Sequence, residues 1–201
     1  MLSRVLQHPR IALLVLGAVC ALGFPPIHLW PLALLALGAA AILIRFSGSV
    51  RSAFFRGWLV GLAHFTATNL WIATAFTHQQ EMPAIIGWFA VPLLSAFLAL
   101  YPALAFAAAY RLARGKSTLV FALALGGAWI VAEWLRATLF TGYAWGPFSL
   151  ALLGPFDRPG LAALLPFTGT YALSGLAVVL AVALIDQALR REWARLAIVS
   201  V

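Results

Sequence analysis

Two side chains of opposite charge stand three residues apart inside a long apolar segment of this sequence. Glu133 and Arg136 lie in the stretch 118–140, where most other residues are apolar. At this spacing the two side chains share one face of a helix and can form an ion pair. A charged group in a bilayer costs about 2.5 to 3.5 kcal/mol even on the mildest scale. The pair therefore indicates either a structural link between helices or the polar corner of a lipid or substrate pocket.

The position of the pair along its helix indicates the leaflet that it occupies. Glu133 is fifteen residues beyond Thr118, where the apolar stretch begins. This separation corresponds to roughly 22 Å along a helix, within a hydrocarbon core about 30 Å thick. The pair is therefore expected in the half of the bilayer remote from the start of the helix.

The residues that follow the pair combine glycines with aromatic side chains. The segment includes Thr141, Gly142, Tyr143 and Trp145. Tyrosine and tryptophan are common at membrane–water interfaces. The segment indicates either an ordinary aromatic belt or a rim beside the charged pair.

A second polar cluster lies at comparable depth in the apolar stretch 54–76, where Asn69 is close to Trp71. Asparagine in a membrane helix commonly bonds to another helix, which favours a structural role. If this cluster faces Glu133 and Arg136, the two form one outward-opening polar pocket. The residues expected at such a lipid or substrate site are Glu133, Arg136, Thr141, Gly142, Tyr143, Trp145, Asn69 and Trp71.

The residue types needed for covalent or metal chemistry are scarce. Cys20 is the sole cysteine and lies in an apolar run without a basic neighbour in sequence, so we expect it to be inert. The four histidines are widely separated, and no Cys or His spacing predicts a metal site. We expect no cofactor, no metal and no catalytic residue within this chain.

The composition identifies the kind of molecule that positions these residues. The chain has 201 residues, of which 64% are hydrophobic and 9% charged, and its mean hydropathy is +1.02. A soluble domain carries about 25% charged residues. The chain is therefore predicted to be a single all-α domain over 1–201, an integral membrane bundle of several spans. The net charge of +8 does not indicate nucleic-acid binding, because the basic residues are not gathered into one patch.

Apolar runs near the length of a membrane span predict six transmembrane helices and a truncated seventh. The expected helices cover approximately 11–24, 29–44, 54–76, 83–110, 118–140 and 168–189, with a seventh starting at 193. The first two are short and meet near Pro25 and Pro26, which favours a tight helical hairpin.

The basic residues favour one orientation. Eleven of the thirteen lysines and arginines fall before the first helix, in alternate connections, or after the sixth helix, all on one side of this arrangement. Cytoplasmic connections carry an excess of lysine and arginine, so the N-terminus is expected in the cytoplasm.

Several stretches, taken together and in order, resemble the bacterial apolipoprotein N-acyltransferases. They are Gly23-Phe24-Pro25-Pro26 with Leu29-Trp30-Pro31-Leu32-Ala33, Asn69-Leu70-Trp71-Ile72, Glu133-Trp134-Leu135-Arg136 with Thr141-Gly142-Tyr143-Ala144-Trp145, and Gly169-Thr170-Tyr171-Ala172-Leu173-Ser174. The third stretch is the most specific. One departure is Ala144, where the family tends to have proline.

The resemblance implies a function at the outer face of the bacterial inner membrane. Members of the family transfer an acyl chain from a phospholipid donor to the N-terminal cysteine of a diacylated lipoprotein, through a thioester on their own cysteine. That cysteine belongs to a nitrilase-like domain with a Glu, Lys and Cys triad, which maps onto no residue here. The resemblance thus implies the membrane portion of an acyltransferase, inactive alone, with the lipid bilayer, the donor and the lipoprotein as partners.

Two other classes of protein fit the same composition. A small transporter or channel would have charged groups along a path to both faces, or inverted repeats. A membrane assembly protein without a substrate is the third possibility.

Overall fold

The computed structural model describes residues 9–78, 83, 85–139, 142–154, 158 and 160–199, with side chains up to Arg191. The described residues contain helices and connections but no strand. The elements in order are α2 (Pro9–Ala21), α3 (Trp30–Arg45), α4 (Val50–Thr68), α5 (Leu70–Thr77), α6 (Ile85–Leu98), α7 (Leu100–Leu112), α8 (Thr118–Thr138), the 3-10 turns η1 (Phe148–Leu152) and η2 (Gly160–Leu164), α9 (Leu165–Thr168) and α10 (Thr170–Val199).

Four of the predicted spans are confirmed as helices long and apolar enough to cross a membrane. They are Val50–Thr77, Ile85–Leu112, Thr118–Thr138 and Thr170–Arg191. The first two predicted spans are also helical, but α2 has only 13 residues and α3 only 16. The predicted helical bundle is therefore present, with two of its helices shorter than the roughly 20 residues of a typical span.

The expectation of a seventh helix starting at 193 is wrong, because α10 continues without a break from Thr170 to Val199. No glycine or proline occurs between Leu189 and Val199 to end the helix. Arg190 also donates a hydrogen bond of 2.7 Å to Asp186, one turn earlier on the same helix. Such an i,i+4 pair supports helix continuation through this charged stretch.

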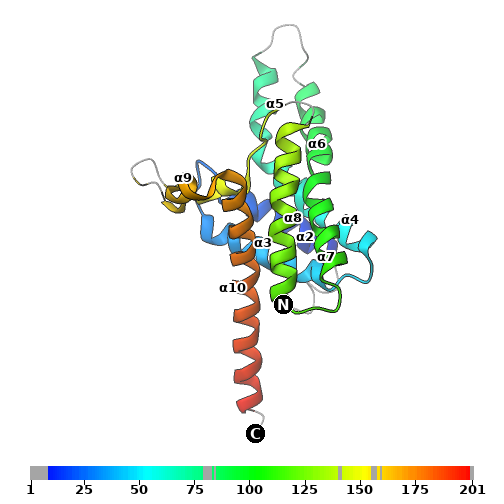
Figure 1. Ribbon diagram of the computed structural model, residues 1–201. Coiled ribbons are helices and arrows are strands. Elements are labelled where there is room, and N and C mark those ends of the chain that lie inside the picture. The colour runs from blue at the N-terminus through cyan, green and yellow to red at the C-terminus, as the bar shows by residue number, and fades with distance from the viewer. Residues whose placement is uncertain are drawn as a thin grey trace.

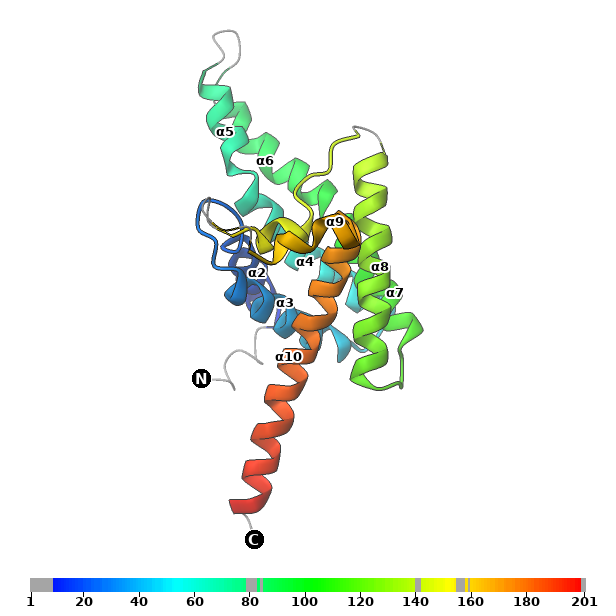
Figure 2. The ribbon, with the colours of Figure 1, turned by 60° about the vertical axis from the view of Figure 1, so that its left-hand side comes forward.

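The long helices pack around a core that is contributed mainly by α3, α7, α8 and α10. α8 packs against α7 and α10, α4 packs against α2 and α7, and α3 packs against α2 and α10. The α5–α6 pair projects at one end, while α10 extends furthest at the other (Figures 1 and 2). η1, η2 and α9 run across the helices rather than along them (Figure 2).

Small residues allow the helices to approach closely. A methyl group at Gly17 of α2 would collide with the carbonyl of Val60 in α4, and one at Gly38 of α3 would collide with the carbonyl of Ala181 in α10. Interfaces between membrane helices are enriched in small residues for this reason. The two glycines thus fix how α2 and α3 sit against their neighbours.

Two of the long spans are interrupted, and each interruption has a local cause. α4 and α5 are separated at Asn69, just after Thr68, whose hydroxyl donates to the carbonyls of His64 and Phe65. This kind of back-bonding often bends a helix. α6 and α7 are separated at Ala99, three residues before Pro102, which cannot donate a backbone hydrogen bond.

The basic connections gather at one end of the bundle, which we call the basic end. Arg45, at the end of α3, donates a hydrogen bond of 2.9 Å to the carbonyl of Lys116, just before α8. Arg10 lines the same hollow as Arg51, so the start of α2 lies beside the start of α4. The two serines that cap α4 and α8, Ser49 and Ser117, accept backbone hydrogen bonds at this end.

Candidate functional site

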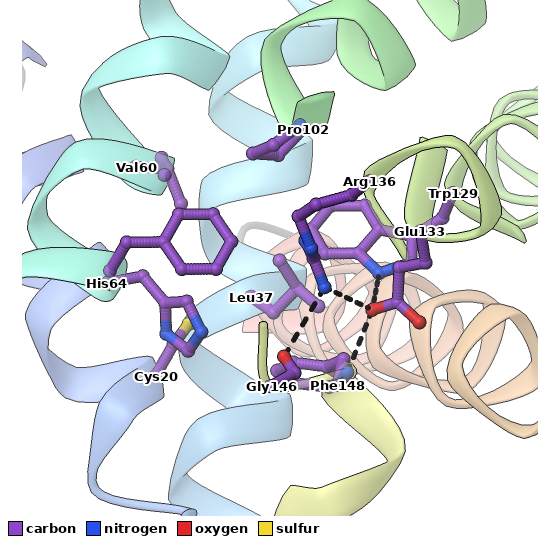
Figure 3. A pocket seen from close by; sticks show the side chains of 12 residues that line it. Cys20, Leu37, Val60, His64, Pro102, Trp129, Glu133, Arg136, Gly146 and Phe148 are labelled. Carbon is purple, nitrogen blue, oxygen red and sulfur yellow. Dashed lines mark hydrogen bonds and ion pairs between the residues drawn. The ribbon is translucent and has the colours of Figure 1, made fainter. Parts of the chain in front are cut away.

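Glu133 and Arg136 lie in the last turns of α8 and are almost completely buried, with 1% and 3% of their surface exposed. Arg136 Nη2 is 3.6 Å from Glu133 Oε1 (Figure 3). The i,i+3 ion pair predicted from the sequence is therefore present. Because the pair is buried, its stability depends on what else surrounds each charge.

The Glu133 carboxylate joins α8 to the start of η1. Its Oε1 accepts a hydrogen bond of 2.9 Å from Trp129 Nε1, on the preceding turn of α8. The same oxygen accepts one of 2.8 Å from the backbone N–H of Phe148. Hydrogen bonds to a carboxylate are stronger than neutral ones, so this contact holds the end of the connection from α8 against the helix.

The Arg136 guanidinium holds the middle of the same connection. Arg136 Nε donates to the carbonyl of Ala144, and Nη2 donates to the carbonyl of Gly146, both at 3.4 Å. Its Cζ also lies over the ring of Phe65 in α4, 4.9 Å from the ring centroid. The guanidinium thus contacts an acid, two carbonyls and an aromatic face, all from this chain.

The cavity beside the pair is small. It has a volume of about 20 Å³, and its lining includes Cys20, His64, Glu133, Arg136 and Gly146 (Figure 3). A single water molecule needs roughly 10 to 15 Å³ on this measure. The cavity therefore has room for about one water molecule, and a phospholipid headgroup is too large for it.

The connection held by the pair has an unusual backbone. Trp145 has φ of +50°, in the left-handed region, and is flanked by Gly146 at +64°, with Gly142 at +65° nearby. A bulky residue in this region is uncommon and costs roughly 1 to 2 kcal/mol. The carbonyls on either side of Trp145, those of Ala144 and Gly146, are the two that Arg136 binds. Arg136 therefore fixes the backbone that presents the Trp145 side chain.

Four of the predicted site residues line one open groove. Asn69, Trp71, Tyr143 and Trp145 all contribute to a hollow of about 490 Å³, which we call the aromatic groove. The rings of Tyr143 and Trp145 meet edge to face, with their centroids 4.9 Å apart. The expectation that Asn69 and its neighbours share one pocket with Glu133 and Arg136 is not met in that form. Asn69 and Trp71 instead line this groove with Tyr143 and Trp145, whereas Glu133 and Arg136 line a separate cavity.

The remaining predicted residues lie outside the aromatic groove. Glu133 and Arg136 line the small buried cavity instead, and Gly146 lines both spaces. Gly142 is exposed on the connection and does not line the groove. Thr141 lies outside the described residues.

Sequence reasoning missed one wall of the aromatic groove. This wall is formed by the α2–α3 connection, including Phe24, Pro25, Pro26 and Ile27. The His28 ring, in the same connection, makes a hydrogen bond of 3.4 Å with the carbonyl of Leu153. The available signal was the Phe-Pro-Pro run, which indicated a hairpin and contributed to the family resemblance but did not by itself predict a site.

The surroundings of Cys20 confirm that it is buried, with 2% of its surface exposed. Its thiol donates a long contact of 3.7 Å to the carbonyl of Ala33. Cys20 has no basic neighbour in the sequence, as expected. In the folded chain, however, His64 of α4 lines the same small cavity as Cys20. Within the described residues, no group of three or more His, Cys, Asp or Glu could hold a metal ion.

Comparison with known proteins identifies relatives along almost the whole chain. The family model for the apolipoprotein N-acyltransferase N-terminal domain matches residues 16–183. An apolipoprotein N-acyltransferase from Ralstonia nicotianae is 39% identical over 185 residues, covering 89% of this chain and 34% of the relative. Those from Vibrio vulnificus and Vibrio cholerae are 32% and 30% identical over 98% and 96% of this chain. The chain spans about a third of the length of these curated relatives. Together with the order of its motifs, these matches show that the chain belongs to the apolipoprotein N-acyltransferase family.

Proposed function

We propose that this chain is the membrane-embedded part of an apolipoprotein N-acyltransferase and that its role is to hold lipid substrates for acyl transfer. The activity would move a phospholipid acyl chain to the N-terminal cysteine of a diacylated lipoprotein. The observation that carries the proposal is the aromatic groove, where residues from three separate segments meet. Family membership supports the reaction class, and the groove supports the part that this chain plays in it.

The lining of the aromatic groove suits an amphiphilic ligand. Trp71, Tyr143 and Trp145 supply large apolar surfaces with a polar edge, a combination that is common where acyl chains meet headgroups. Asn69 adds a side-chain amide from the break between α4 and α5. The volume of about 490 Å³ lies within the usual range of roughly 300 to 1,000 Å³ for small-molecule sites. The groove therefore accommodates part of a lipid molecule, such as one acyl chain.

Glu133 and Arg136 contribute indirectly in this proposal. Their contacts are with Trp129, Phe65 and the backbone of 144–148, and their cavity is too small for a headgroup. We therefore assign them as positioning residues that set the conformation of Trp145. This assignment combines the two alternatives raised by the sequence, because a structural pair shapes the lipid site.

A transporter is less well supported. Transport needs a polar path that opens to both faces of the membrane. The charged pair of α8 lies instead beside a cavity of about 20 Å³. No inverted repeat is apparent in the sequence.

The proposed location is the bacterial inner membrane, with the basic end in the cytoplasm and the aromatic groove toward the periplasm. Impermeant thiol reagents can test this orientation on cells that express this chain, because its single cysteine, Cys20, is buried. A cysteine at exposed Gly142 should react from outside, and one at exposed Gly48 should react only after the membrane is opened. The reverse pattern would contradict the orientation.

The groove itself is tested in the full-length enzyme with a photoactivatable phospholipid. We expect cross-links to the segments 67–71 and 143–146, and we expect Trp145→Ala to lower both cross-linking and acyl transfer by tenfold or more, about 1.4 kcal/mol. Trp134→Ala is the matched control, because Trp134 is 52% exposed on α8 and does not line the groove. Normal cross-linking and turnover in a folded Trp145→Ala protein would refute the proposed site.

A further inference from the structure

A second hollow lies at the basic end, far from the residues assigned to substrate. It has a volume of about 490 Å³ and lies between the end of α3 and the α7–α8 connection. Arg45, Arg114 and Lys116 contribute to its lining. The hydrogen bond from Arg45 to the carbonyl of Lys116 joins its two sides, which are 71 residues apart in sequence. The hollow is therefore built from two segments that the fold brings together.

The charge of this hollow is unbalanced. Its lining holds three cations, and neither acidic side chain described by the structure, Glu133 or Asp186, contributes to it. Asp186 pairs with Arg190, and Glu133 pairs with Arg136 on another part of α8. α8 also begins at Thr118, two residues after Lys116, so the positive end of its dipole adds to the local potential. A ligand for this hollow is therefore an anion.

A buried hydroxyl also points to a ligand. Ser47 lines the hollow and is 6% exposed, and its Oγ has no hydrogen-bond partner among the described residues. Buried hydroxyls are normally paired, and an unpaired one requires an explanation. A phosphate oxygen in the hollow would accept a hydrogen bond from this hydroxyl. This is independent of the cations, because Ser47 is neutral.

The flank of the hollow favours an amphiphilic anion over a free one. Phe46 lines the hollow and is 70% exposed, and Arg45 Cζ lies 5.2 Å from the centroid of its ring. An exposed aromatic ring beside cations at the end of a membrane helix is suited to the boundary between headgroups and acyl chains. Clusters of lysine and arginine at that level attract anionic lipids.

We propose that this hollow is a binding site for the phosphate of an anionic phospholipid in the leaflet at the basic end. Arg114 and Lys116 contact the phosphate, the Ser47 hydroxyl donates to one of its oxygens, and Phe46 contacts the glycerol and upper acyl region. The bound lipid links α3 to the α7–α8 connection. The site is separate from the aromatic groove, so its existence does not depend on the acyltransferase proposal.

The test uses the full-length protein purified in detergent and titrated with phosphatidylglycerol, with native mass spectrometry to count bound lipid. Phosphatidylcholine with the same acyl chains separates the effect of headgroup charge from that of the chains. Inorganic phosphate, added as a competitor, separates a lipid site from a free-phosphate site. We expect a saturable phosphatidylglycerol site that phosphatidylcholine does not fill and that millimolar phosphate does not empty.

Variants locate the site. Arg114→Gln with Lys116→Gln should weaken phosphatidylglycerol binding about 30-fold, since each cation near a membrane surface contributes about fivefold. Ser47→Ala should weaken it about fivefold, the effect of one hydrogen bond. Both cations are exposed, and the Lys116 carbonyl that binds Arg45 is unchanged in the double variant.

The matched control removes the same charge from another part of the basic end. Arg10→Gln with Arg51→Gln changes two exposed arginines that line a different hollow. We expect binding to change less than threefold in this control. An equal loss in both double variants would show diffuse attraction to the basic end and overturn the proposal. Binding that survives Arg114→Gln with Lys116→Gln, or that inorganic phosphate abolishes, would overturn it too.

Discussion

The two sides of the connection after α8 differ in almost every physical respect. On one side, Glu133 and Arg136 bind its backbone in a buried setting with room for about one water molecule. On the other, Tyr143 and Trp145 line an open groove of about 490 Å³. The closed side has directional polar contacts, and the open side has broad apolar surfaces. The backbone of this short segment is fixed by Glu133 and Arg136 on the closed side. The segment can therefore present its aromatic rings to a ligand on the open side.

The largest expected effect comes from removing one charge on the closed side. Arg136→Met leaves the Glu133 carboxylate buried without its cation and releases the carbonyls of Ala144 and Gly146. Loss of one partner of a buried pair costs about 3 to 5 kcal/mol, so we expect a large fall in the temperature of unfolding in detergent. Arg190→Met is the matched control, because Arg190 is largely exposed in its pair with Asp186. Its removal should cost less than about 0.5 kcal/mol. Similar losses in the two variants would contradict a stabilising role for the buried pair.

A smaller loss of stability is expected when both charges are removed together. Glu133→Gln with Arg136→Gln leaves no uncompensated charge, so it should be less destabilising than Arg136→Met. The connection would lose its charged contacts, and acyl transfer per folded full-length enzyme should fall because Trp145 is no longer fixed. The measurements are thermal unfolding and turnover on the same preparation. Unchanged turnover in a well-folded double variant would rule out a positioning role.

Two substitutions can separate the backbone strain at Trp145 from the contribution of its indole side chain to lipid binding. Both Trp145→Gly and Trp145→Ala remove the indole, but only glycine adopts φ near +50° without a steric penalty. We expect the glycine variant to be more stable than the alanine variant by about 1 kcal/mol, and both to lose lipid cross-linking. Equal stability of the two would show that the left-handed conformation is not retained in solution.

The smallest effect on activity is expected at Cys20. Its replacement by alanine removes a buried sulfur next to the small cavity, which should cost about 1 kcal/mol of stability. Acyl transfer by the full-length enzyme should be unchanged, because the thiol is buried and does not line the aromatic groove. Turnover and a search for an acyl group on Cys20 by mass spectrometry check this expectation. Acylated Cys20 in the native protein would overturn it.

The parts of the fold that depend on local sequence were predictable. The apolar run after Lys116 gives α8, and the cap at Ser117 marks its start. The continuation of α10 past Arg190 differs from the predicted end at 189, because the apolar run ends there whereas the charged residues that follow still favour a helix.

The candidate site was predictable only in part, for a different physical reason. The spacing of Glu133 and Arg136 is a local signal, and so are the aromatic residues after them. Their partners are not local: the Phe148 N–H is fifteen residues beyond Glu133, and Phe65 belongs to another helix. The wall from the α2–α3 connection likewise meets the groove through tertiary packing. Contacts of this kind have no periodic signature in one sequence.

The shortness of α2 and α3 has a consequence for how a lipid would reach the aromatic groove. Helices of 13 and 16 residues rise only about 20 to 24 Å, whereas the hydrocarbon layer is about 30 Å thick. If α2 starts and α3 ends at the level of the headgroups at the basic end, the connection between them lies short of the opposite surface, and tilting shortens its reach further. Phe24, Pro25 and Pro26 then lie below that surface, at the depth of the acyl chains. In the proposed lipid site, an acyl tail would then enter the groove sideways from its own monolayer, without passing through water.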